Sequence, residues 1–137
     1  MPSLDRAGAS QAGSTTTAGR VTGAPALLLR LEGGVELGAA ILAYALLGGG
    51  WLMFVVLLLA PDLSMLGYLA GNRVGAAIYN TAHTYLAPAA LALLAWALHL
   101  PPWVTLAALI WAAHIGMDRL LGFGLKYPGG FKATHLG

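Results

Sequence analysis

Long apolar runs, separated by short glycine-rich or polar stretches, make up the chain from residue 26 onward. The runs cover residues 26–47, 51–69, 74–98 and 103–121. Each is close to the ~20 mostly apolar residues that a helix needs to cross a bilayer, provided that the second run continues through Pro61. The pattern therefore predicts an all-α fold, an integral membrane four-helix bundle with short connections and antiparallel neighbours.

The composition favours a membrane protein over a soluble domain. Hydrophobic residues fill 58% of the 137 positions, charged residues only 9%, and the mean hydropathy is +0.76. A soluble domain normally has about a quarter of its residues charged. The chain has no cysteine, which excludes disulfides and thiolate metal ligands. The pI near 9.2 does not call for a nucleic-acid partner, because in a membrane chain the positions of the basic residues matter more than their sum.

Residues 1–25 differ from the rest of the chain. They are rich in Ser, Thr, Gly and Ala, and nothing in them can bury enough apolar surface to fold. We expect a disordered polar tail over residues 1–25. The membrane domain then covers residues 26–137 and ends in a short interfacial C-terminal tail.

The basic residues predict the orientation. With four spans, both termini and the connection near residue 72 lie on one side of the membrane. All Lys and Arg residues fall on that side: Arg6, Arg20, Arg30, Arg73, Arg119, Lys126 and Lys132. The positive-inside rule then places both termini in the cytoplasm, in a multi-pass protein of the inner (cell) membrane. The lipid bilayer is thus the first expected partner.

Ionisable side chains gather in the same half of the predicted bundle. His114 and Asp118 are four residues apart and share one face of their helix. Asp62 follows Pro61 near the cytoplasmic end of the second helix, and His83 lies early in the third. Ionisable residues at membrane depth are costly in lipid and usually functional. The sequence therefore predicts a site where the four helices meet on the cytoplasmic side.

Two imidazoles with two or three carboxylates make a donor set for a divalent metal, with Zn, Fe or Mn as candidates. The candidate ligands are Asp62, His83, His114 and Asp118. Glu36, as a base or further ligand, and Asp118 are the candidate catalytic residues. A metal in this place lowers the pKa of a bound water and produces a nucleophile at neutral pH.

Three basic residues near the headgroups form a candidate anion site. They are Arg73, Arg119 and Lys126. Guanidinium and ammonium groups here suit an anionic lipid or a phosphate-bearing substrate.

Other interpretations of the same residues stay open. His83 and His114 can instead hydrogen-bond to the two aspartates and lock the helices in register, as buried polar groups do in membrane bundles. Haem held by the two histidines, or a path for protons or ions through the carboxylates, would also use them.

Several segments resemble a family of small bacterial membrane proteins known as domain of unknown function family 4260. The segments are LLRLEG (28–33), APDLSMLGYLAG (60–71), YNTAHTYLAP (79–88), AHIGMDRLLGFGLKYPGGF (113–131) and THLG (134–137). The resemblance covers nearly all of the chain from Leu28 onward and implies no activity. It implies that the family's motif positions are Glu32, Asp62, Tyr79, Asn80, His83, His114, Asp118, Arg119, Lys126, Tyr127 and His135.

A second similarity is to inner-membrane metal-dependent hydrolases of the bacterial DNA-damage response. It rests on Pro-Asp at residues 61–62, Asp62 included, on His83, and on the later His-xxx-Asp pair of His114 and Asp118. The chain departs from that pattern at Ser64, where those hydrolases have a second acid. It also lacks the His-Arg pair that precedes their Thr-His. The similarity implies a metal-dependent hydrolase at the cytoplasmic face, and the competing class is a non-enzymatic membrane module.

Overall fold

The computed structural model describes residues 19–136, and the regular structure in that range is helical. The elements are α1 (Gly23–Leu46), α2 (Trp51–Leu58), the 3₁₀-helix η1 (Ala60–Ala70), α3 (Asn72–Ala82), α4 (Leu86–Ala97) and α5 (Pro102–Leu121). Within the described range the only extended pairing is an isolated antiparallel bridge between Lys126 and Thr134. The predicted all-α fold is confirmed. Of the polar tail expected over residues 1–25, residues 1–18 lie outside the described part, whereas Gly23 to Pro25 begin α1.

The second and third predicted helices are each interrupted near a proline. α2 ends at Leu58, and the chain continues as η1, whose first turn holds Pro61. Proline has no N–H to donate and is tolerated in the first turn of a helix, so the α-helix ends before it. The next interruption lies between α3 and α4, where His83 has left the helical conformation (φ −111°, ψ 20°). Pro88 then lies in the first turn of α4.

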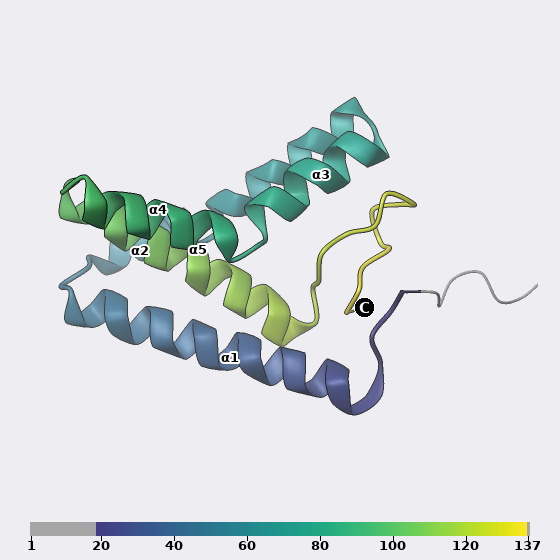
Figure 1. Ribbon diagram of the computed structural model, residues 1–137, viewed down its shortest axis with the longest axis horizontal. Helices are drawn as coiled ribbons and strands as arrows, with labels where there is room; N and C mark the ends of the chain where they lie inside the picture. The colour runs from purple at the N-terminus through teal and green to yellow at the C-terminus, as the bar shows by residue number, and fades with distance from the viewer. Residues whose placement is uncertain (1–18, 137) are drawn as a thin grey trace, which may run out of the picture.

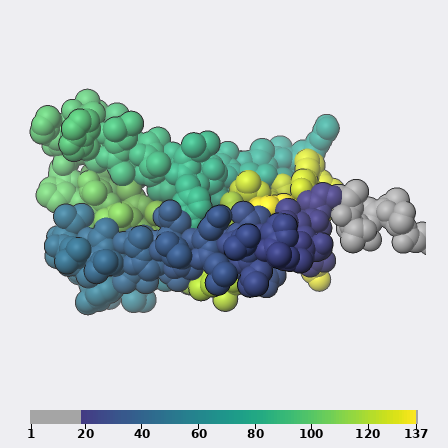
Figure 2. All heavy atoms as spheres, turned by 60° about the horizontal axis from the view of Figure 1, so that its bottom comes forward, coloured from purple at the N-terminus to yellow at the C-terminus, as the bar shows by residue number. Residues whose placement is uncertain are grey.

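The helices run back and forth along one long direction (Figure 1). α1 and α5 lie side by side over much of their length, α4 packs on α5, and η1 pairs with α3. The glycine turn after α1 and the loop before α5 lie at one end of the molecule. The turn between η1 and α3 and the C-terminal segment (residues 122–136) lie toward the other end. In Figure 2, α1 extends along the near face with the yellow C-terminal segment beside its first half.

Two small residues let α1 and α5 approach closely. A Cβ atom added to Gly116 would lie 2.7 Å from the carbonyl oxygen of Gly33 and 2.7 Å from the backbone nitrogen of Leu37. Both distances are shorter than real Cβ atoms tolerate, so the backbones meet here only because both residues are glycine. Further along α1 the contact opens, since a Cβ on Gly38 meets nothing within 4 Å.

The core at the other end of α1 is aromatic. Tyr44 is fully buried, and its ring lies 5.1 Å, centroid to centroid, from the edge-on ring of Phe54. Its hydroxyl donates a hydrogen bond of 2.7 Å to the carbonyl of Gly50. This bond fixes the glycine turn between α1 and α2.

Within residues 19–136, two helical stretches are long and apolar enough to cross a membrane: Trp51–Ala70, which comprises α2 and η1, and Pro102–Leu121, which is α5. Only 6% of the apolar window in the first stretch is buried inside the protein, against 39% in the second. α2 and η1 therefore present large apolar side chains to the outside, such as Leu52, Val55 and Leu69.

Candidate metal centre

α5 supplies two of the four groups at the centre. His114 and Asp118 are one helical turn apart, and His114 Nε2 lies 3.6 Å from Asp118 Oδ2. His114 is completely buried, and Asp118 is 9% exposed. Their shared face, predicted from the i, i+4 spacing, points at the two interruptions in the neighbouring helices.

The interruption before η1 supplies Asp62. Its backbone N–H bonds to Leu59 O (3.2 Å), closing the first 3₁₀ turn after Pro61. Asp62 Oδ1 is buried and has no hydrogen-bond partner among the described residues, although the side chain as a whole is 35% exposed. The carboxylate thus points one oxygen inward from the edge of the site.

The end of α3 supplies His83, which is 2% exposed. Its Nδ1 lies 3.0 Å from the carbonyl oxygen of Tyr79, and its ring stacks on the Tyr79 ring at 3.7 Å between centroids. A ring nitrogen facing a carbonyl must carry the proton, so the Nε2 of His83 keeps a free lone pair. Fixing an imidazole through Nδ1–H to a backbone carbonyl is how proteins usually orient a histidine that binds a metal through Nε2.

These four residues, the His/Asp cluster, converge on one point. The atoms that meet are Asp62 Oδ1, His83 Nε2, His114 Nε2 and Asp118 Oδ2, all within 4.8 Å of one another. Every imidazole–carboxylate separation, and the separation of the two imidazole nitrogens, falls between 3.1 and 3.6 Å. Four ligands at about 2.0–2.1 Å around a tetrahedral Zn²⁺ lie about 3.3–3.4 Å from each other. Five of the six separations in the cluster therefore match the edges of a tetrahedral metal site, and the sixth, between the two carboxylate oxygens, is at most 4.8 Å.

The interruption between α3 and α4 exposes backbone carbonyls that a continuous helix would satisfy, and α5 provides their donors. Trp111 Nε1 donates to the carbonyl of Ala82 (2.6 Å), and Arg119 Nη2 donates to that of His83 (3.2 Å). Unpaired carbonyls are costly when buried, so these two bonds stabilise the bend that carries His83 into the cluster. Trp111 was not singled out from the sequence. Its position three residues before His114, on the same helical face, is the signal that was available.

The C-terminal segment folds back against the cytoplasmic side predicted for the site. Asn80 clamps the backbone of Lys126, donating to its carbonyl (2.8 Å) and accepting from its N–H (2.7 Å). Lys126 is 8% exposed, its Nζ donates to Phe131 O (2.9 Å), and burial lowers the pKa of its ammonium. The ammonium also lies 4.6 Å from the centroid of the Tyr79 ring.

His135 ties this segment to α5. Its Nδ1 accepts a hydrogen bond from the N–H of Leu125 (2.8 Å), and its Nε2 lies 3.0 Å from Arg119 Nη1. Burial, with the nearby charge of Arg119, lowers the pKa of His135, so the imidazole is neutral at neutral pH. The Arg119 guanidinium thus lies between the carbonyl of His83 and the imidazole of His135 in the C-terminal segment.

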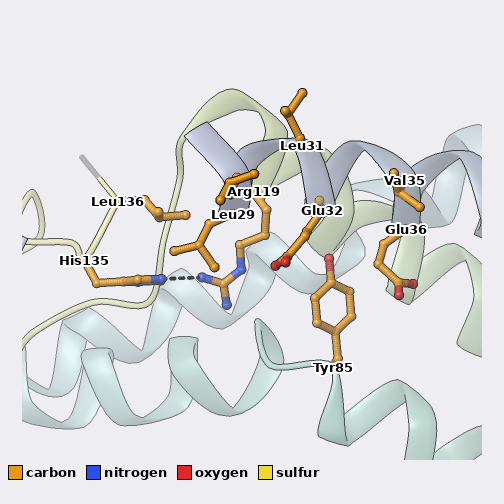
Figure 3. A pocket seen from close by; sticks show the side chains of 11 residues that line it. Leu29, Leu31, Glu32, Val35, Glu36, Tyr85, Arg119, His135 and Leu136 are labelled. Atoms are coloured by element: carbon orange, nitrogen blue, oxygen red, sulfur yellow. Dashed lines mark hydrogen bonds between the residues drawn. The ribbon is translucent and has the colours of Figure 1, made fainter. Parts of the chain in front are cut away.

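The remaining predicted site residues lie elsewhere. Glu36 is exposed on α1 and does not belong to the His/Asp cluster; it lines a separate cavity together with Tyr85 and Arg119 (Figure 3). Arg73 is exposed in the first turn of α3. The anion site of Arg73, Arg119 and Lys126 stays a prediction, with the latter two already bonded within the protein.

These features define an all-helical protein with two stretches apolar enough to cross a membrane and a buried group of two histidines and two aspartates. The chain belongs to the family described as domain of unknown function DUF4260, whose model matches residues 26–137. The family membership expected from the sequence is therefore confirmed. No curated protein and no solved structure matches the chain. The family description carries no activity, so function has to come from the site.

Proposed function

We propose that this protein is a multi-pass membrane protein that binds a divalent transition-metal ion in the His/Asp cluster and uses it for hydrolysis. The supporting observation is the convergence of four ligand atoms from three separate chain segments, with five of their six separations between 3.1 and 3.6 Å. Imidazole with carboxylate suits Zn²⁺, Fe²⁺ or Mn²⁺. The arrangement of His83, with Nδ1–H bonded to a backbone carbonyl, adds the expected outer support.

The charge of the cluster favours a bound cation over a polar lock, in which the four side chains would only hydrogen-bond to one another and hold the helices in register. With neutral imidazoles, two carboxylates bring two negative charges together, and His114 Nε2 can donate its single proton to only one of several acceptors. The inward oxygen of Asp62 then has no donor among the described residues. Protonating both histidines would instead place two cations with their nitrogens 3.1 Å apart. Buried charges need a partner, and one divalent cation balances both carboxylates.

The haem interpretation is disfavoured by the same distance. Two axial histidines have their nitrogens about 4 Å apart on opposite sides of the iron, at metal–nitrogen distances near 2 Å, with the macrocycle between them. His83 and His114 have their nitrogens 3.1 Å apart and their ring centroids 5.1 Å apart, which leaves no room for it.

Membrane placement is supported by the outward apolar surface and by the distribution of charge. Large exposed apolar areas mark membrane or protein interfaces. Here such residues cover α2, η1 and α4, whereas the turns after α1 and before α5 contain no Lys or Arg. We therefore infer four passes in the inner membrane, with both termini in the cytoplasm.

Hydrolysis is favoured by the open side of the cluster. A bound divalent ion supplies a water of lowered pKa. Asp62 is the most exposed member of the cluster, so the protein covers the centre least on its side. A mostly apolar cavity of about 380 Å³ lies beside it, lined among others by Pro61, Ser64 and Trp111. This cavity has room for the apolar part of a membrane-soluble substrate.

Elemental analysis of the purified protein tests the metal. One equivalent of a transition metal is expected, lost in Asp62→Asn and in His114→Gln. His99→Asn is the matched control, because His99 lies in the loop before α5 with φ 50°, a conformation that asparagine tolerates. A metal-free wild type that is folded, or metal retained by both cluster variants, would overturn the proposal. Hydrolysis of membrane-soluble esters and phosphoesters by the metal-loaded protein then tests the activity separately.

A further inference from the structure

A second, larger cavity is lined by Arg119 but by none of the residues of the His/Asp cluster. It has a volume of about 660 Å³ and lies between α1, Tyr85 and the end of the C-terminal segment. Figure 3 shows the Glu32 carboxylate, the Arg119 guanidinium and the Tyr85 hydroxyl directed toward one another, with Glu36 one turn further along α1. None of these groups is needed to hold the metal.

Arg119 has hydrogen-bonding capacity left for a ligand. A guanidinium has five N–H donors in a planar fork, which matches phosphate and carboxylate oxygens. The described contacts use at most two of them: one is donated to the carbonyl of His83, and a second lies 3.0 Å from His135 Nε2, which can accept it only when Nδ1 carries the ring proton. The remaining edge of Arg119 forms part of the cavity wall.

The opposite wall carries negative charge. Glu32 and Glu36 are four residues apart on α1, so they share the face that lines the cavity. Neither forms an ion pair within 4.0 Å with any described residue. An anion alone would be repelled by this wall, and a cation alone would leave Arg119 without a counter-ion.

The hydroxyl of Tyr85 is a further unused group. It is buried and has no hydrogen-bond partner among the described residues. A buried hydroxyl normally has a partner, and one that lacks it in a polar cavity indicates a missing ligand or water.

The cavity also has an apolar border. Leu28, Leu31 and Val35 line it and are 58%, 52% and 71% exposed. On a membrane-spanning α1 these side chains face lipid acyl chains. A ligand that binds the polar groups inside can therefore extend an apolar part outward along α1.

We propose that this cavity binds the headgroup of a phospholipid with a primary amine, of the phosphatidylethanolamine type. Its phosphate binds Arg119 and Tyr85, its ammonium binds Glu32 and Glu36, and its acyl chains lie along the apolar border. A primary ammonium donates hydrogen bonds to the two carboxylates, which the quaternary ammonium of phosphatidylcholine cannot do. The proposal rests on the membrane placement given above, but not on the metal.

Native mass spectrometry of protein from nanodiscs with equal amounts of phosphatidylethanolamine, phosphatidylcholine and phosphatidylglycerol of the same acyl chains tests the assignment. Wild-type adducts are expected to be enriched in phosphatidylethanolamine over both others. Glu32→Gln combined with Glu36→Gln should lower the ratio of phosphatidylethanolamine to phosphatidylglycerol adducts about tenfold, which corresponds to about 1.4 kcal/mol. Adducts that mirror the bilayer composition, or a ratio unchanged in the double variant, would overturn the proposal.

Tyr85→Phe provides a second measure, because it removes only the hydroxyl. It should lower phospholipid adducts about threefold, whereas Tyr127→Phe, whose hydroxyl bonds to Gly19 O outside the cavity, should not. If the double glutamine variant does not fold, the comparison of Tyr85→Phe with Tyr127→Phe tests the lipid site instead: equal adduct levels in these two variants would overturn the proposal. Soluble glycerophosphoethanolamine distinguishes the source: failure to displace the adduct supports a lipid, and full displacement overturns the lipid assignment. Measuring the metal content of the same samples shows whether lipid binding is lost independently of the metal, so the two proposals are tested separately.

Discussion

The indole nitrogen of Trp111 on α5 lies 2.6 Å from the carbonyl oxygen of Ala82, the last residue of α3. In an uninterrupted helix that carbonyl would accept a bond from the N–H of residue 86. Here α3 ends, and the indole N–H of Trp111 from α5 donates to this carbonyl instead. The bend that places His83 in the His/Asp cluster is thus stabilised from α5, the helix that also carries His114 and Asp118.

Trp111→Phe should destabilise this bend. The ring remains, but the donor is lost, and an unpaired buried carbonyl costs about 1–3 kcal/mol. We expect a lower free energy of unfolding in mixed micelles and weaker metal binding. Trp96→Phe is the control, because Trp96 is 77% exposed on α4. Equal effects of the two substitutions would contradict the assigned role of Trp111.

Chelation should lower the thermal stability of the wild type. A ligand that binds only the folded state stabilises it by about 4 kcal/mol when present at a thousand times its Kd. Adding a strong chelator to the metal-loaded protein should therefore lower Tm, and adding back the metal should restore it. Asp62→Asn should show a low Tm with or without chelator. A wild-type Tm that is unchanged by the chelator would argue that the four side chains form only a hydrogen-bonded polar lock.

Gly116→Ala should separate α1 from α5. The added Cβ meets the backbone of Gly33 and Leu37 at 2.7 Å, and backbone atoms cannot move aside as a flexible side chain does. Overpacking of this kind costs about 1–3 kcal/mol. Gly38→Ala on the same helix pair meets nothing within 4 Å and should be neutral or stabilising by about 0.5–1 kcal/mol. Unfolding in denaturant at constant micelle concentration compares the two, and a stable Gly116→Ala would contradict the close packing.

Acid should release the C-terminal segment. Burial and Arg119 lower the pKa of His135 in the folded protein below its ordinary value of 6.5, so the unfolded segment binds protons more readily. The stability contributed by neutral His135 is complete above about pH 6.5 and is lost as the pH falls below that value. Hydrogen exchange at the amides of Leu125 and Lys126 should therefore accelerate from pH 7.5 to pH 5.5, after correction for intrinsic rates.

The matched variants assign this effect to one histidine. His135→Gln cannot titrate and should remove the excess acceleration, whereas His99→Asn, in the loop at the other end, should leave it. A pH response that persists in His135→Gln would place the titrating group elsewhere.

Local sequence patterns were enough to predict part of the site. The i, i+4 spacing of His114 and Asp118 fixes a shared face on any helix, and Pro61 marks where Asp62 leaves regular α-helix. The structure brings these residues together with His83 as the topology suggested. Such features depend on neighbours in the chain, which is why they can be read from it.

The features missed from the sequence depend on contacts between distant residues. Pro88 indicates a break near His83, since it has no N–H to donate to the carbonyl of Thr84, but the bonds from Trp111 and Arg119 that stabilise the bend come from a distant helix. Asn80, implied by the resemblance to be a family motif position, binds the backbone of Lys126, 46 residues away in sequence. Glu36 was predicted as a base or a further metal ligand, and its position on α1 places it at the second cavity, outside the His/Asp cluster.

The 3₁₀ form of η1 also sets how far the chain travels from the metal centre. A 3₁₀-helix rises about 2.0 Å per residue and an α-helix about 1.5 Å, so Tyr68 lies about 12 Å along the axis from Asp62 instead of about 9 Å. At that height the Tyr68 ring meets the Phe131 ring edge-on, with centroids 5.2 Å apart, and lies 5.8 Å from the Lys126 ammonium. The 3₁₀ winding of η1 thereby lets Phe131 of the C-terminal segment pack on the same element that carries Asp62.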